Sequence, residues 1–452
     1  MLTRLDLRER PLTGAELTSA LPRAAMDVDE ALSRVQPIIA QVRQEGAAAL
    51  RDLAERFDGV RPTHLRVPIA AIHEAVDSLA PEVRDALERL IAHLRAGHTA
   101  QLPEDRATEI MPGGVVRQRW VPVRRVGLYA PGGLAVYPSS VAMNVVAAQV
   151  AGVEELAVAS PPQQSNGGLP EPVVLAACGL LGIDEVYAVG GAQAVAMFAY
   201  GAAASSEEDR AALAGSAGTR TGQLCEPVDV ITGPGNIYVA AAKRAVMGTV
   251  GIDSEAGTTE IAVIADAHAN PAYVATDLIS QAEHDPHAAS VLITDSVELA
   301  DAVDTEIAAR VPHAAHAERI RQALSGPQSA SVLVESIDRA IEVADAYGAE
   351  HLEIQTADAA AVAGRIRNAG AIFVGPYSPV PLGDYLAGSN HVLPTGGTAR
   401  FASGLGVMAF IKSVQQVEYG ERALKTLAAP LTALAHSEDL PAHAQSVNAR
   451  FE

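Results

Sequence analysis

Several residue types that mark secreted, membrane or nucleic-acid-binding proteins are scarce in this sequence. Its two cysteines, Cys178 and Cys225, form neither a CxxC pair nor a disulfide framework. The formal net charge of −21 would repel a phosphate backbone. The apolar runs are too short and too often broken by glycine to span a bilayer, and the N-terminal segment has no signal-peptide core. We therefore expect a cytoplasmic protein that binds neither nucleic acid nor a membrane.

Aromatic residues are also rare, at 4 % of the chain, whereas apolar residues occupy 49 % of its 452 positions. Alanine, valine and glycine are abundant, as in packed α/β layers. The charged fraction of 19 % is typical of an ordered globular protein. A chain of this length predicts two or three domains, each with a core of its own.

Strand and helix patterns alternate through the middle of the chain. Residues 27–102 have the three- and four-residue apolar spacing of helices. Apolar strands that each lead into a helix follow, with the sequences RVGLYAPGG, ELAVASPP, EVYAVGG and VDVITGPGN. Each strand is a continuous apolar run, which predicts a parallel sheet covered on both faces.

A second series of strands comes after the first. These strands are predicted at residues 260–265, 290–294, 331–334, 352–355 and 371–375. The pattern predicts the α/β class, with two open parallel, incomplete Rossmann-like domains, one nested in the other. The expected parts are an N-terminal arm at 1–25, an outer domain at 26–128 and 259–400, an inserted domain at 129–258, and a C-terminal helical tail at 401–452.

Glycine-rich turns connect three of the first strands to their helices. They are YAPGG at 129–133, GGAQAV at 190–195 and GPGN at 233–236. Such turns let the backbone approach a phosphate, and the following helix N-terminus favours an anion. None is a GxGxxG motif, and no acidic residue is evident about 20 positions later, so each alone can be an ordinary βα turn. Three on neighbouring strands favour a nucleotide site at the carboxyl edge of the sheet.

The segment DLISQAEHDPHA, residues 277–288, ends a predicted helix in polar side chains. Asn270 and Pro271 suit the N-cap and first position of that helix. Gln281 and His284 are three residues apart and therefore lie on one face near its C-terminal end. Two side chains at this spacing can bind one metal ion, although a histidine at a helix C-terminus is also stabilised by the helix dipole.

Two further places combine an imidazole with a carboxylate. Glu350 and His351 precede a buried strand. They can supply a base and a group that activates water, or they can be a helix end beside a surface glutamate. Asp384 and His391 lie in a long loop rich in glycine and proline, a kind of loop that is often functional, although Asp384 can also form an Asx turn.

The tail segment HSEDLPAHAQSV adds Glu438 and His443, which can equally belong to a solvated polar helix. With Gln281, His284 and Asp384, the His443 imidazole completes a set of nitrogen and oxygen donors of the kind that zinc accepts. A metal set, a Glu–His pair and nucleotide turns in one chain indicate alcohol oxidation with hydride transfer to a nicotinamide.

These motifs together resemble the histidinol dehydrogenase family, in the family's order and over nearly the whole chain. The segments that carry the resemblance are VGLYAPGG, VGGAQAVA, ITGPGNIYVAAAKR, LISQAEHDP, AEHLEIQT, GAIFVGPYSPVPLGDYLAGSNHVLPT and DLPAHAQSV. The resemblance implies an NAD-dependent enzyme of histidine biosynthesis with one Zn²⁺ per subunit. It would oxidise L-histidinol through bound L-histidinal to L-histidine. It would also be a homodimer in which residues 401–452 complete the partner's site.

The resemblance also implies roles for individual residues. His351 would be the general base of the alcohol step, and Glu350 would activate the water that attacks histidinal. The zinc ligands would be Gln281, His284, Asp384 and His443, with His443 donated by the partner subunit. The NAD site would contain Tyr129, Gln193 and Asn236, which lie in or beside the glycine turns. The substrate would contact Thr259, Gln281, His284, His351, Asp384, His391, Glu438 and His443.

Two segments depart from the family's pattern. The sequence GTTE at 257–260 has Thr258 where the family commonly has proline, and we expect Thr258→Pro to change the Michaelis constant only modestly. Residues 201–227 are polar and predict a surface loop. Within it, residues 203–222 exceed the family's usual link, and we expect this insertion to be dispensable.

Two other functions stay open at this point. The same metal set could activate water in a metal-dependent hydrolase, which would be active without NAD. The same fold could also carry a catalytically silent NAD-binding protein, because a fold does not fix a function.

Overall fold

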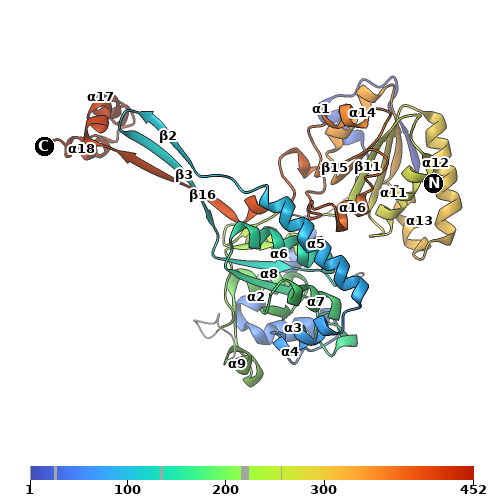
Figure 1. The fold of residues 1–452 in the computed structure, drawn as a ribbon, viewed down its shortest axis with the longest axis horizontal. Helices are drawn as coiled ribbons and strands as arrows, with labels where there is room; N and C mark the ends of the chain where they lie inside the picture. The colour runs from blue at the N-terminus through green and yellow to red at the C-terminus, as the bar shows by residue number, and fades with distance from the viewer. Residues whose placement is uncertain (1, 25–27, 133–135, 215–222, 256) are drawn as a thin grey trace.

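The chain folds into two parallel sheets, with a long antiparallel ribbon that projects away from them (Figure 1). The computed structural model describes residues 2–24, 28–132, 136–214, 223–255 and 257–452. In the two larger sheets each described strand pairs in parallel with its neighbours. The predicted α/β class is therefore confirmed.

The larger sheet contains all strands of the second predicted series. In order, its strands are β1 (Thr3–Asp6), β13 (Ala330–Leu333), β12 (Ala289–Thr294), β11 (Glu260–Ala265), β14 (His351–Gln355) and β15 (Ala371–Val374). Successive residues of β11 point to opposite faces of the sheet, so Val263 and Ile264 enter the two opposite cores. One face is covered by α11 (Pro271–Ala282), α12 (Val297–Arg310), α13 (Ala317–Ser325) and α16 (Val380–Tyr385). The other is covered by α1 (Gly14–Ala20), α14 (Ile337–Tyr347) and α15 (Ala359–Ala363).

The smaller parallel sheet contains the first predicted series. In order, its strands are β10 (Gly251–Ile252), β9 (Val230–Thr232), β4 (Arg125–Tyr129), β5 (Glu155–Ser160) and β6 (Val186–Ala188). One face packs against α2 (Val28–Glu45), α3 (Ala47–Phe57), α8 (Gly191–Tyr200) and α10 (Ile237–Val246). The opposite face packs against α4 (Ile69–Asp77), α5 (Pro81–Thr99), α6 (Pro138–Ala151) and α7 (Pro172–Leu180).

This packing differs from the expected grouping of residues 26–128 with residues 259–400. The helices α2 to α5 lie on the five-stranded sheet, where Leu50 and Ile72 enter its two opposite cores. The physical reason is that the strands of this sheet are apolar on both faces. Their crossover helices cover only part of that surface, and the N-terminal helices bury the rest.

The ribbon carries the C-terminal helices away from both sheets. Its antiparallel strands are β2 (Arg106–Met111), β3 (Gly114–Pro122) and β16 (Ile411–Tyr419). Helices α17 (Glu421–Ser437) and α18 (Pro441–Asn448) lie at its far end (Figure 1). Short 3-10 turns lie at η1 (Gln164–Asn166), η2 (Val311–His313), η3 (Thr398–Arg400) and η4 (Val407–Ala409). Among the described helices, none combines the length and hydropathy needed to cross a membrane.

The stretch at 201–227 is more ordered than the surface loop expected from its composition. It contains the short pair β7 (Ala202–Ala203) and β8 (Gln223–Cys225), and helix α9 (Glu207–Ala214). Asp209 of α9 is buried and forms an ion pair with Arg51 of α3 at 2.6 Å. A buried carboxylate with a fixed partner anchors this part of the insertion. Residues 215–222 lie outside the described residues.

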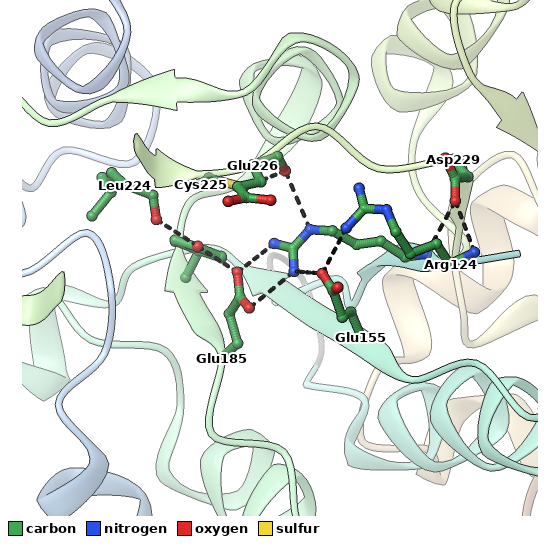
Figure 2. Close-up of polar contacts among 9 residues, drawn as sticks. Arg124, Glu155, Glu185, Leu224, Cys225, Glu226 and Asp229 are labelled. Carbon is green, nitrogen blue, oxygen red and sulfur yellow. Dashed lines mark hydrogen bonds and ion pairs between the residues drawn. The ribbon is translucent and has the colours of Figure 1, made fainter. Parts of the chain in front are cut away.

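A buried ion network holds the amino end of the five-stranded sheet (Figure 2). Arg125, at the start of β4, donates to Glu185 at 2.5 and 3.1 Å and lies 3.4 Å from Glu155. The Tyr187 hydroxyl is 2.7 Å from the same Glu185 carboxylate. The Arg125 guanidinium lowers the pKa of Glu185 against the opposing effect of burial. The network joins β4, β5 and β6 at the edge opposite the glycine turns.

We expect Arg125→Met to lower the free energy of unfolding by about 3–5 kcal/mol, because it leaves the buried Glu185 carboxylate without the guanidinium that donates two hydrogen bonds to it. Arg124→Met is the matched control. Arg124 is half-exposed and bonds Glu155 at 2.9 Å, so its loss should cost less than about 1 kcal/mol. Urea unfolding followed by circular dichroism compares the two variants. Equal losses would show that burial of the Arg125 pair is unimportant.

Candidate active site

The predicted catalytic residues lie at the amino ends of two neighbouring strands. His351 is the first residue of β14, and Thr259 and Glu350 directly precede β11 and β14. Gln281 is in the last turn of α11, which returns to this edge because a helix between parallel strands runs antiparallel to them. Open α/β sheets usually bind ligands at the carboxyl edge. In the six-stranded sheet this cluster lies instead at the amino edge of the strands.

A chain of hydrogen bonds joins three of these side chains. The Gln281 amide Nε2 donates to Thr259 Oγ1 at 2.6 Å, and the Thr259 hydroxyl donates to Glu350 Oε2 at 2.6 Å. With its amide nitrogen so engaged, Gln281 presents its other atom, Oε1. That oxygen is buried and has no hydrogen-bond partner among the described residues. A buried oxygen held in this way is suited to bind a cation or to accept a hydrogen bond from a ligand.

The backbone of Glu260 fixes the tautomer of His351. His351 Nδ1 lies 3.2 Å from the Glu260 carbonyl oxygen, which can only accept, so Nδ1 carries the proton. The Nε2 atom is left with a lone pair, is buried, and has no hydrogen-bond partner among the described residues. Burial lowers the pKa of His351, which keeps the ring neutral. A neutral imidazole with an unused lone pair is equipped to accept a proton.

Glu350 is buried beside this imidazole, with Oε2 3.5 Å from His351 Nδ1. Burial raises the pKa of Glu350 to about 8, against the lowering effect of hydrogen bonds from Thr259 and from the Glu260 N–H. Its titration therefore falls close to neutral pH, where a carboxylate can exchange a proton with water.

We call the two parallel sheets with their helices and loops the main body, to distinguish them from the ribbon and its C-terminal helices. His284 and Asp384 complete the part of the cluster that lies in the main body. Asp384 Oδ1 is 3.9 Å from His351 Nε2. Burial lowers the pKa of His284, and the nearby Asp384 charge opposes that effect. His284 is thus a neutral imidazole next to a carboxylate, the protonation state that a metal ligand requires.

His391 connects this cluster to the five-stranded sheet. Its Nδ1 donates to the Asp384 carbonyl oxygen at 3.0 Å, and its Nε2 lies 3.1 Å from the Ser140 hydroxyl. Ser140 belongs to α6, which follows β4 of the other sheet. The sequence signals Ser140 only as a residue at a helix start, so its contact with His391 could not be foreseen.

The donors in the main body fit a zinc ion but do not form a complete set. Among the described residues, no group of three or more His, Cys, Asp or Glu side chains is placed to hold a metal. Of those types the candidate set has only His284 and Asp384 here, and the amide oxygen of Gln281 adds a third donor. The orphaned Gln281 Oε1 is the observation that favours a cation. A four-coordinate site needs one more ligand.

Glu438 and His443, the remaining predicted residues, are not part of this cluster. Glu438 is the C-cap of α17 and His443 lies in α18, and both side chains are exposed. These helices are at the far end of the ribbon (Figure 1). Within one chain, the structure therefore separates these two residues from the other candidates.

The predicted NAD-binding residues gather at the carboxyl edge of the five-stranded sheet. Tyr129 ends β4, and its hydroxyl accepts the Gly191 N–H at 3.1 Å. Gln193 is buried in the first turn of α8. Asn236 caps α10 by accepting from two backbone N–H groups, one of them Tyr238 N at 3.0 Å. The glycine segments are therefore tight βα turns, and they also bring the three polar residues to one edge of the sheet.

A buried ion pair between Lys243 and Asp253 holds the GPGN turn by hydrogen bonds. Lys243 Nζ donates to the Gly233 carbonyl and to Asp253 Oδ1, both at 2.5 Å. Asp253 Oδ2 accepts the Gly233 N–H at 2.9 Å. Gly233 has a φ of 120°, and a Cβ there would lie 2.0 Å from the Tyr129 carbonyl oxygen. The ion pair thus bonds both the carbonyl and the N–H of Gly233, and the turn packs closely against the end of β4.

Comparison with known proteins identifies the family. The histidinol dehydrogenase family model matches residues 21–451. The chain is 59 % identical to histidinol dehydrogenase of Nocardia farcinica, with 100 % of this chain and 98 % of the relative covered. It is 58 % identical to the Bifidobacterium longum enzyme, over 99 % of this chain and 93 % of the relative.

A solved structure agrees with these sequences. The crystal structure of histidinol dehydrogenase from Elizabethkingia anophelis superposes with a TM-score of 0.89 at 28 % identity. The match covers 100 % of this chain and 98 % of the other. On the sequence and the fold together, the chain belongs to the histidinol dehydrogenase family.

Proposed function

We propose that the protein oxidises L-histidinol to L-histidine through bound L-histidinal, with two NAD molecules reduced in turn. The observation that carries this proposal is the buried, unpartnered His351 Nε2 beside Glu350, whose pKa lies near 8. An alcohol step needs a base for the hydroxyl proton, and an aldehyde step needs water to be added before a second hydride can leave. The two neighbours supply one group for each step.

We assign the first proton transfer to His351 and the activation of water to Glu350. The Glu260 carbonyl keeps the His351 Nδ1 proton in place, so Nε2 is the atom that accepts the hydroxyl proton. Thr259 and the Glu260 N–H hold Glu350 by Oε2, and Thr259 can also contact substrate. His391 is held by Asp384 and Ser140 at the boundary between the two sheets, where substrate and nicotinamide would meet.

One zinc ion per subunit would be held by Gln281, His284, Asp384 and His443 of the partner subunit. Bound there, zinc would fix the amino and imidazole nitrogens of the substrate. Glu438 of the partner subunit would pair with the substrate's amino group. The neutral state of His284 and the orphaned Gln281 Oε1 support this donor set.

The ribbon supports a dimer with shared sites. Its strands, its helices and the link between the helices expose large apolar side chains that a single chain leaves uncovered, namely Ile110, Val414, Val417, Leu434 and Leu440. Exposed apolar side chains on a projecting element favour burial against a second copy. Exchange of the ribbon between two chains would bring Glu438 and His443 to the partner's cluster.

The packing also supports a revised division into domains. We propose that residues 28–255, without the ribbon strands β2 and β3, form the NAD-binding domain around the five-stranded sheet. Residues 2–24 and 257–400 form the domain with the catalytic cluster, and the ribbon strands with residues 401–452 form the exchanged part. A biosynthetic enzyme of this kind would act in the cytoplasm.

Counting NADH tests the proposed reaction. With limiting L-histidinol and excess NAD, we expect two NADH per histidinol, loss of turnover with a chelator, and recovery with zinc. One NADH would remove the assigned role of Glu350. Turnover without NAD would favour a metal-dependent hydrolase. Bound NAD and zinc without turnover would favour a catalytically silent NAD-binding protein.

The NAD assignment predicts an effect of the buried pair beneath the GPGN turn. Lys243→Met removes the donor to Gly233 and should weaken NAD binding about tenfold or more. Arg244→Met is the control, because Arg244 is more exposed and bonds Glu255 instead. Fluorescence titration with NADH measures both affinities. Unchanged binding by a folded Lys243→Met protein would argue that the cofactor binds elsewhere.

A further inference from the structure

A buried acidic pair lies directly behind the catalytic cluster, and none of the proposed steps uses it. Glu353 is on β14, two residues beyond His351 and therefore on the same side of the strand, and is 1 % exposed. Asp277 is on α11, one turn before Gln281. The Gln355 amide Nε2 donates to both carboxyl groups, at 3.0 Å to Asp277 and 3.1 Å to Glu353.

Because both carboxyl groups accept from the same amide nitrogen, they lie close together in the interior. Burial raises the pKa of both carboxyl groups, and the Asp277 charge raises that of Glu353 further. Two ionised carboxylates this close would repel each other, and burial penalises both charges. The pair is therefore an acid and a carboxylate that share one proton and carry one negative charge.

The pair touches every segment that carries the metal and base residues of the main body. Asp277 is on α11, which leads to Gln281 and His284. Glu353 is on β14, which begins with His351. The other carboxyl oxygen of Glu353, Oε1, accepts the Val380 N–H at 2.9 Å. Val380 begins α16, which carries Asp384.

We propose that Asp277 and Glu353 are positioning residues, whose hydrogen bonds through Gln355 and to Val380 hold α11, β14 and α16 at the spacing that zinc and the base require. This inference rests on the proposed function. Stability alone does not explain the pair, since a well-packed apolar pair would fill the space without the desolvation cost of a buried charge. Hydrogen bonds that join α11, β14 and α16 in fixed directions, by contrast, set the relative positions of the metal ligands.

The test compares Glu353→Gln with Glu353→Leu in the zinc-loaded enzyme. The glutamine amide can donate to Asp277, so zinc affinity in a chelator competition should stay within about threefold of wild type. Leucine cannot donate, and zinc affinity should fall at least about tenfold, with a matching loss in kcat. The NADH affinity of both variants should be unchanged, because that site belongs to the other sheet.

Val380→Pro provides a second variant in case Glu353→Leu fails to fold. Proline suits the first position of a helix and removes the N–H that Glu353 accepts, while it replaces the buried Val380 side chain by another apolar one. Zinc affinity should again fall several-fold. Either variant, folded and with zinc affinity within twofold of wild type, overturns the inference. A wild-type protein that neither binds zinc nor oxidises histidinol overturns the proposed function instead.

Discussion

Replacing Glu350 by glutamine is expected to lower kcat for histidinol oxidation by about 10²–10³-fold, the usual effect of losing a general base. Glutamine has the same shape and can still accept from Thr259 and from the Glu260 N–H, so the fold and the zinc site should survive. The loss should fall on the aldehyde step. Single-turnover formation of the first NADH would be nearly normal, and the second would be slow.

The pH dependence of the same variant gives an independent check. The Glu350 pKa is about 8, so the carboxylate that acts as base is lost as pH falls below that value. Wild-type kcat should therefore rise with pH through about 8, and Glu350→Gln should lack this limb. A limb that persists in the variant would assign the titration to another group. Glu283→Gln, which changes an exposed carboxylate beside His284, is the matched control.

Stability should respond to pH in the opposite direction. A carboxyl group whose pKa rises on folding binds more protons in the folded than in the unfolded state between the two pKa values. For Glu350 this window runs from the ordinary glutamate pKa of 4.5 to about 8, so the metal-free protein should lose stability as pH rises across it. Glu350→Gln should reduce that loss, which urea unfolding at both ends of the window would measure.

Mixed dimers should recover activity that neither parent has. A His351→Asn subunit lacks the base, and a His443→Ala subunit lacks the tail ligand, so each homodimer should have less than about 1 % of wild-type activity. A purified heterodimer of the two would contain one site with an intact main body and an intact tail. We expect about half of wild-type activity per dimer. The reason is the position of His443 at the end of the ribbon, apart from its own chain's cluster.

The matched control places both substitutions in one subunit and pairs it with a wild-type subunit. If tails are exchanged, each site of this dimer has one defect and activity should be nearly absent. If each tail served its own chain, the two results would be reversed, and the shared-site proposal would be wrong. Tandem affinity tags on coexpressed chains would isolate both heterodimers.

Much of the fold and part of the site could be predicted because the signals are local. Continuous apolar runs predicted the strands β11 and β4, and their burial on both faces predicted two parallel sheets. Glycine turns after β4 and β9 predicted the polar edge with Tyr129 and Asn236. Adjacent residues such as Glu350 and His351 were recognisable as a pair because their chemistry is contiguous.

The tertiary structure alone decided the features that depend on residues far apart in the chain. It placed α2 to α5 on the five-stranded sheet and brought Gln281, Thr259 and Glu350 into one hydrogen-bonded chain at an amino edge. It raised the Glu350 pKa by burial and moved His443 out along the ribbon. Periodicity and spacing report only which face a residue occupies, whereas contacts, burial and charge interactions depend on which distant segments pack against that face.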